Sequence, residues 1–148
     1  GMSAPVPTEA YDIPLGKGNI IRPGKDVTIV AYARMANEAI IAAKELAEEG
    51  IDCEIIDPRT LQPLDSDLII DSAKKTNRVL VAQEAVRFGG LGAEIASQIQ
   101  EMAFDYLDAP VRKLTSIDAP LPYAENLEQL ALPKTKNIIA LAKELCNK

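Results

Sequence analysis

The sequence contains no histidine, no tryptophan and only two cysteines among its 148 residues. Without histidine there is no Ser-His or Cys-His nucleophile pair, and the commonest acid–base residue and metal ligand are also missing. Cys53 lies in an apolar run, which predicts a buried and inert thiol rather than part of a disulfide framework or Cys/His metal site. Catalysis would have to use carboxylates, lysine or tyrosine, which argues against an independent active site.

Long apolar runs and an excess of positive charge are missing as well. No stretch approaches the roughly 18 consecutive apolar residues that a membrane span needs, and the first residues lack the basic-then-apolar pattern of a signal peptide. The net charge is −6, from 16 basic and 22 acidic residues. An acidic surface disfavours nucleic acid and attracts basic proteins. We therefore expect no nucleic-acid or membrane partner, and a cytoplasmic location.

The residues that are present predict one globular domain. Apolar residues make up 47% of the chain and charged residues 26%, as is usual for such domains. Residues 1–17 are rich in proline, and a glycine precedes Met2, so this part reads as an extended lead-in with the remnant of a tag. Residues 18–148 are expected to form the domain.

β-Branched apolar runs alternate along the chain with segments of helical periodicity. Strands are expected at 19–21, 27–31, 51–57, 78–83 and 111–116, and helices at 35–49, 66–75, 93–103, 126–130 (a single turn) and 133–146, with Asp65 and Ser66 capping the second helix and Pro133 opening the last. This alternation is typical of βαβ units. The predicted fold class is α/β, a three-layer α/β/α sandwich with a mostly parallel, about five-stranded sheet.

Two charged loops follow predicted strands, at the edge where open α/β sheets bind their ligands. After the second core strand, the favoured interpretation is a stiff loop in which Arg59 pairs with a carboxylate; the alternative is an anion held by Arg59 and oriented by Asp57. After the next strand, Glu84 is an acid or base without a positioned partner. An ion pair between Glu84 and Arg87 is therefore the favoured interpretation.

A glycine-rich turn follows, with Gly89, Gly90 and Gly92 ahead of a helix. The dinucleotide fingerprint requires a third glycine where this chain has Ile95, and no P-loop pattern occurs. The favoured interpretation is a tight turn with close packing of helix on sheet, and the alternative is anion binding at an interface loop.

The segment from Phe104 to Asp108 gathers two aromatic and two acidic residues in a chain with 4% aromatic residues. Such clustering favours an interface that includes Asp105, Tyr106 and Asp108. The alternative is that Phe104 and Leu107 pack into the core.

Six blocks, at 11–17, 24–30, 55–65, 83–96, 104–111 and 119–133, resemble in order and spacing the transketolase-like C-terminal domain of the beta subunit of 2-oxoacid dehydrogenases. Enzymes of this family act on pyruvate, branched-chain 2-oxoacids or acetoin, and pyruvate is the first expectation. Relatives often carry histidine at the position of Gln83.

The resemblance implies a heterotetramer of alpha and beta subunits that binds thiamine diphosphate and magnesium outside this domain. That enzyme decarboxylates a 2-oxoacid and acylates a lipoyl group. The domain itself is expected to hold no cofactor and to be inactive alone. Its implied roles are contact with a second beta subunit and docking onto the peripheral subunit-binding domain of the acyltransferase core, through Asp108 with its neighbours Asp105 and Tyr106, and through the chain end at Lys148.

Two other functions are kept as alternatives. The first is the corresponding domain of a transketolase or deoxyxylulose-phosphate synthase. The second is a stand-alone regulatory domain that binds a small anion between the loops of Arg59 and Gly90.

Overall fold

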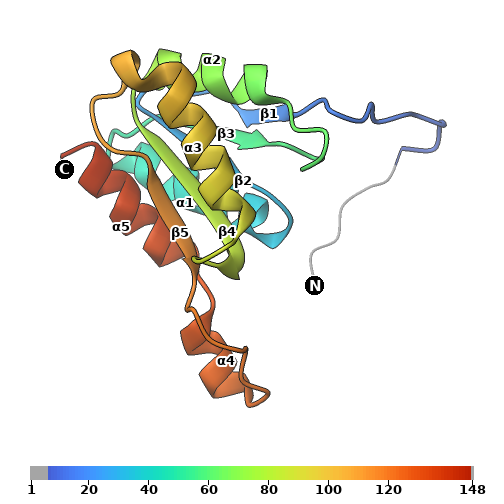
Figure 1. Cartoon of the computed structure of the whole chain (residues 1–148), viewed down its shortest axis with the longest axis vertical. Helices are drawn as coiled ribbons and strands as arrows, with labels where there is room; N and C mark the ends of the chain where they lie inside the picture. Colours follow the sequence, from blue (N-terminus) through green and yellow to red (C-terminus); the bar gives the residue numbers. More distant parts are fainter. Residues whose placement is uncertain (1–6, 148) are drawn as a thin grey trace.

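One five-stranded sheet organises the computed structural model, which describes residues 7–147 (Figure 1). The elements in chain order are β1 (Asn19–Arg22), β2 (Val27–Ala31), α1 (Arg34–Glu48), β3 (Cys53–Asp57), α2 (Ser66–Thr76), β4 (Val79–Val86), α3 (Leu91–Ala103), the 3₁₀ turn η1 (Phe104–Tyr106), β5 (Arg112–Ser116), α4 (Glu125–Ala131) and α5 (Thr135–Leu145).

The strands lie in the order β1-β3-β2-β4-β5. The four strands β2 to β5 are parallel, and β1 runs antiparallel to β3 at one edge. Helices α1 and α5 cover one face of the sheet, and α2 and α3 cover the other (Figure 1). The predicted three-layer α/β sandwich with a mostly parallel sheet is confirmed.

Strand β2 is buried over its whole length because both of its faces meet a helical layer. Ile29 and Ala31 point into the core beneath α1 and α5, whereas Val30 points into the core beneath α2 and α3. This alternation on a fully covered strand explains why its sequence reads as a nearly continuous apolar run.

The one polar residue of β2, Thr28, is tied to α2. Its hydroxyl lies 2.6 Å from Ser72 Oγ and 2.7 Å from Thr76 Oγ1. Ser72 Oγ in turn donates to Glu54 Oε1 at 2.5 Å, and the Lys75 ammonium pairs with the other carboxylate oxygen of Glu54. Glu54 is only 1% exposed, so this network satisfies a carboxylate that would otherwise be costly to bury.

Several element ends differ from their predicted positions. Asp65 occupies the N-cap position of α2 as predicted, but its side chain does not cap the helix: its Oδ2 accepts a hydrogen bond from Gly18 N at 3.0 Å instead. Ile51 lies before β3 and closes α1 instead, with its N–H donating to Leu46 O. Pro133 does not open α5, which begins at Thr135.

Strand β4 runs to Val86, beyond its predicted end at Gln83. The last residues stay beside β5 because the Ser116 hydroxyl donates to the carbonyl of Glu84 and Val86 pairs with Ser116 across a register shift.

Helix α4 is longer than the single turn predicted, and it projects away from both layers (Figure 1). Exposed apolar side chains gather on this projection and its approach, namely Ile117, Leu121, Tyr123, Leu127 and Leu130. No helix within residues 7–147 is long and apolar enough to cross a membrane.

The start of α5 is held by a carboxylate from α1. Glu38 Oε2 accepts hydrogen bonds from the backbone N–H of Thr135, at 3.0 Å, and from its hydroxyl. The hydroxyl bond is the largest cause that lowers the pKa of Glu38 below its ordinary value of 4.5, and Arg34 contributes by its charge. Glu38 therefore caps a helix that lies 97 residues away in sequence.

Replacing Glu38 with alanine is expected to lower the free energy of unfolding by about 1 kcal/mol at neutral pH, the usual loss for a helix cap. Because the folded-state pKa is lowered, this contribution is complete above the ordinary value of 4.5 and is lost as the pH falls through the folded-state pKa. Urea unfolding between pH 7 and pH 3 tests this. Glu45→Ala, on the exposed side of the same helix, serves as the control. An equal loss in both variants, or one independent of pH, would contradict the capping role.

Candidate functional site

The predicted site residues divide between opposite edges of the sheet. The amino ends of parallel strands lie at one side of the sheet, here called the amino edge, and their carboxyl ends lie at the opposite side, here called the carboxyl edge. Neither term refers to the edge strands β1 and β5. Arg59, Glu84 and the Arg87–Gly90 loop lie at or beyond the ends of β3 and β4, at the carboxyl edge. Asp105–Asp108 precedes β5 and lies at the amino edge. The carboxyl end of α5 approaches the same edge, where Cys146 lines one hollow together with Arg78; Lys148 lies outside the described residues.

At the carboxyl edge, Asp57 holds its own loop. Its Oδ1 accepts a hydrogen bond from Arg59 N at 2.9 Å, and Arg59 adopts the left-handed conformation at φ 59°. The Arg59 side chain is exposed and forms no ion pair within residues 7–147, so the expected pairing with a carboxylate is wrong for the described chain. An open groove of about 560 Å³ runs past it, lined by Ile13, Leu15, Tyr32, Ala33, Asp57, Arg59, Thr60 and Leu61.

Glu84 pairs with Arg34 rather than with Arg87. The distance from Arg34 Nη1 to Glu84 Oε1 is 3.1 Å. The favoured pair is wrong because α1 begins directly after β2, which brings Arg34 beside the end of β4. The Arg87 backbone is held separately, as Asp118 Oδ1 accepts from Arg87 N at 2.7 Å and from Phe88 N at 3.0 Å.

The glycine-rich turn closes over the side chain of Gln83, which is 1% exposed. Gln83 Oε1 accepts from Gly92 N at 2.7 Å and from the Tyr32 hydroxyl at 2.7 Å, and its Nε2 donates to Val86 O at 3.2 Å. Burial raises the pKa of the Tyr32 phenol, which favours its protonated form as a donor. Gln83 therefore caps the first turn of α3 from a neighbouring strand.

This arrangement accounts for two of the glycines. A Cβ on Gly90 would overlap the Val86 carbonyl oxygen, and a Cβ on Gly92 would lie 2.8 Å from Gln83 Oε1. The Gly92 N–H in the first turn of α3 is already bonded to Gln83 and is not available to an anion. These contacts favour the packing interpretation of the turn over anion binding.

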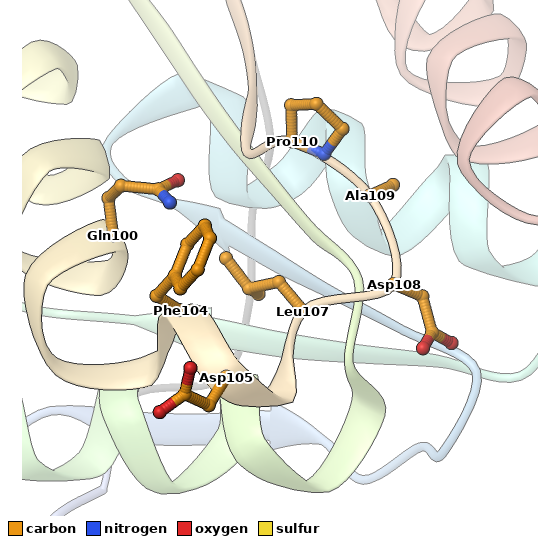
Figure 2. Close-up of a pocket in the computed structure, with 7 residues that line it drawn as sticks. All are labelled: Gln100, Phe104, Asp105, Leu107, Asp108, Ala109 and Pro110. Atoms are coloured by element: carbon orange, nitrogen blue, oxygen red, sulfur yellow. The ribbon is translucent and has the colours of Figure 1, made fainter.

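At the amino edge, aromatic and acidic side chains surround an open cleft of about 560 Å³ (Figure 2). It is lined by Gln100, Phe104, Asp105, Leu107, Asp108, Ala109 and Pro110. The sequence left two interpretations of this segment, an interface or packing into the core, and each fits one of its apolar residues. The Phe104 side chain is 64% exposed, whereas Leu107 packs against the core beneath α2 and α3.

Asp108 is anchored but accessible. Arg78 Nη2 lies 2.7 Å from Asp108 Oδ2, and the aspartate side chain is 53% exposed. Tyr106 is also half-exposed, and Lys74 Nζ lies 5.3 Å from the centre of its ring. Asn77 and Arg78, which hold this segment, were missed from the sequence because they lie some 30 residues before it.

A second, smaller hollow continues the amino edge toward α5. It shares Ala109 and Pro110 with the first and adds Arg112, Glu144 and Leu145. Arg112 and Glu144 form an ion pair there. The two hollows thus form one continuous surface along the amino edge, from η1 to the last turn of α5.

Within residues 7–147, no cluster of three or more acidic or cysteine side chains is placed to hold a metal ion. Cys53 is buried, as expected, and burial raises the pKa of its thiol to about 12. The thiol therefore stays protonated at neutral pH.

Comparison with known proteins gives a consistent result. The family described as transketolase, C-terminal domain, matches residues 16–138. The chain is 47% identical, over 99% of its length, to pyruvate dehydrogenase E1 component subunit beta of Rickettsia felis, and 45% identical, over 91% of its length, to the mitochondrial beta subunit of Dictyostelium discoideum. It spans only 45% and 38% of those two proteins.

Solved structures agree with the fold. A split-gene transketolase, described as an inactive beta4 tetramer, superposes with a TM-score of 0.76 at 30% identity over 93% of this chain and 44% of that one. A 2-oxoglutarate:ferredoxin oxidoreductase from Magnetococcus marinus superposes with a TM-score of 0.55 at 18% identity, covering 88% of this chain and 19% of that one, a likeness of fold alone.

The Gln83 contacts predict the outcome of its replacement. Gln83→Leu should lower the free energy of unfolding by about 2 kcal/mol, because it leaves the buried N–H of Gly92 without an acceptor. Chemical denaturation measures this. Gln129→Leu, an exposed glutamine in α4, is the matched control and should change stability by less than about 0.5 kcal/mol. Equal stability of the two variants would show that Gln83 does not hold the turn.

Proposed function

This chain belongs to the family of transketolase C-terminal domains, and from that premise we propose that it is the C-terminal domain of a thiamine-diphosphate-dependent 2-oxoacid dehydrogenase beta subunit. The observation that carries the proposal is the 47% identity, along nearly the whole chain, to a pyruvate dehydrogenase beta subunit. The split-gene transketolase supports the transketolase alternative, but at only 30% identity.

The whole protein, in this proposal, decarboxylates pyruvate and passes the acyl group to a lipoyl group. The names of two similar relatives, both pyruvate dehydrogenase beta subunits, favour pyruvate over other 2-oxoacids. Thiamine diphosphate, which stabilises the carbanion formed on decarboxylation, and magnesium are assigned to parts outside this chain. The glycine-rich turn does not fit the diphosphate of that cofactor, because the Gln83 side chain packs against Gly90 and Gly92 and accepts the N–H of Gly92.

The domain's first proposed role is assembly with the alpha subunit and a second beta subunit. A related chain that forms a beta4 tetramer supports contact between beta-type subunits. The apolar projection of α4 supports it as well, since exposed apolar patches of this kind mark surfaces that a partner covers. Residues 18–148 are proposed as the folding unit, with residues 1–17 as its lead-in and the cytoplasm as its location.

The second proposed role is docking onto the peripheral subunit-binding domain of the acyltransferase core through the amino edge. Asp105 and Asp108 line the apolar cleft of Figure 2 together with Phe104, and the half-exposed Tyr106 lies between the two aspartates in the chain. The net charge of −6 favours a basic partner, because complementary charge raises the association rate and orients the encounter. The chain end at Lys148 is proposed to complete the contact, as α5 approaches this edge.

The catalytic part of the proposal is tested by reconstitution. The chain with pyruvate, thiamine diphosphate and magnesium should release no carbon dioxide. Activity is expected when the chain is joined to the N-terminal beta domain and combined with the alpha subunit of its source. Carbon dioxide release by the chain alone, or no activity with pyruvate after reconstitution, would contradict the proposal. Activity of the reconstituted protein with a sugar phosphate instead of pyruvate would favour the transketolase alternative.

The docking part is tested at Asp108. Asp108→Ala should weaken binding to the peripheral subunit-binding domain about tenfold in calorimetric titration, with a smaller difference at high salt. Glu128→Ala in α4 makes the same change in net charge at a distant surface and should leave the affinity nearly unchanged. Both variants should keep the circular dichroism spectrum of the unsubstituted chain. Equal affinities of the two variants would remove Asp108 from the docking surface.

A further inference from the structure

The corner between α2 and β4 holds the segment that carries Asp108. Asn77 ends α2 in the left-handed conformation, at φ 61°. Its Nδ2 donates to Lys74 O at 3.1 Å and to Tyr106 O at 2.6 Å, and its own carbonyl accepts from Asp108 N at 2.8 Å. One residue thus bonds the backbone of the docking segment at two points.

The next residue, Arg78, holds the Asp108 side chain. Its Nη2 lies 2.7 Å from Oδ2, and its side chain is 29% exposed against 53% for the aspartate. Its Nε is buried without a hydrogen-bond partner in the described chain. The guanidinium therefore loses hydrogen bonds to water on folding that the described residues do not fully replace. The Asp108 side chain stays half-exposed beside this ion pair.

Lys74 completes the support from α2, with its ammonium over the Tyr106 ring. Backbone, carboxylate and ring of the docking segment are therefore all held by residues 74–78. A segment that is ordered before a partner arrives loses less conformational entropy on binding.

We propose that Asn77 and Arg78 are positioning residues for docking, which fix Tyr106 and Asp108 in the geometry that a basic partner domain recognises. The inference rests on the proposed docking function and assigns these two residues to it. Both residues contact the docking segment, so in this proposal they act on affinity through the positions of Tyr106 and Asp108.

Asn77→Gly isolates the role of the amide side chain. Glycine adopts the φ of 61° without strain, so the backbone of the corner is retained while the bond to Tyr106 O is lost. Affinity for the peripheral subunit-binding domain is expected to fall three- to tenfold. In the double variant with Asp108→Ala, the further loss should disappear, because positioning no longer matters once the positioned carboxylate is gone. In the control double variant of Asn77→Gly with Glu128→Ala, the changes in binding free energy of the two single variants should add.

Arg78→Lys provides a second test that preserves net charge. Because the electrostatic attraction is unchanged, the association rate should stay within about twofold, whereas the dissociation rate should rise several-fold as the fixed guanidinium geometry is lost. Surface-based kinetics measures both rates.

The outcomes separate the two proposals. Normal affinity of Asn77→Gly, or full additivity with Asp108→Ala, would overturn the positioning role while leaving docking intact. Binding that Asp108→Ala leaves unchanged would move docking to another surface and overturn the inference as well. Absence of binding by the unsubstituted chain, shown to be folded, would overturn both.

Discussion

Burial of β2 on both faces is the constraint on which the rest of the structure depends. All five of its residues are buried, with α1 and α5 on one side and α2 and α3 on the other. A sheet covered in this way offers no face to a ligand or partner. The ends of the strands and the α4 projection are the surfaces on which we therefore base the proposed functions.

The two edges are built differently. At the carboxyl edge, Gln83 holds the glycine-rich turn and Glu84 pairs with Arg34, while Arg59 stays exposed beside an open groove. At the amino edge, Asp108 is anchored through one oxygen while its side chain stays half-exposed beside an aromatic-lined cleft. This difference is why we assign docking to the amino edge, although open α/β sheets usually bind small ligands at the carboxyl edge.

The fold was largely predictable because the signals for strands and helices are local. The β-branched run 27–31 and the periodic helix 35–49 need only their own residues to be recognised, and the structure places both within a residue or two. The position of Asp108 was derived from the resemblance to the beta subunit family. By contrast, the roles of Asp65 and Glu38 depend on partners 47 and 97 residues away, and Gln83 bonds Tyr32, 51 residues away, as well as Gly92; no local pattern reveals such contacts.

The central claim is that this domain binds the peripheral subunit-binding domain through the amino edge of its sheet. Nuclear magnetic resonance of the isotope-labelled chain, titrated with the peripheral subunit-binding domain, tests it most directly. The account predicts that amide shifts change around 100–110 and in the last turn of α5, while those of 57–63 and 84–92 stay in place. Changes concentrated in the carboxyl-edge loops, with 100–110 unaffected, would contradict it.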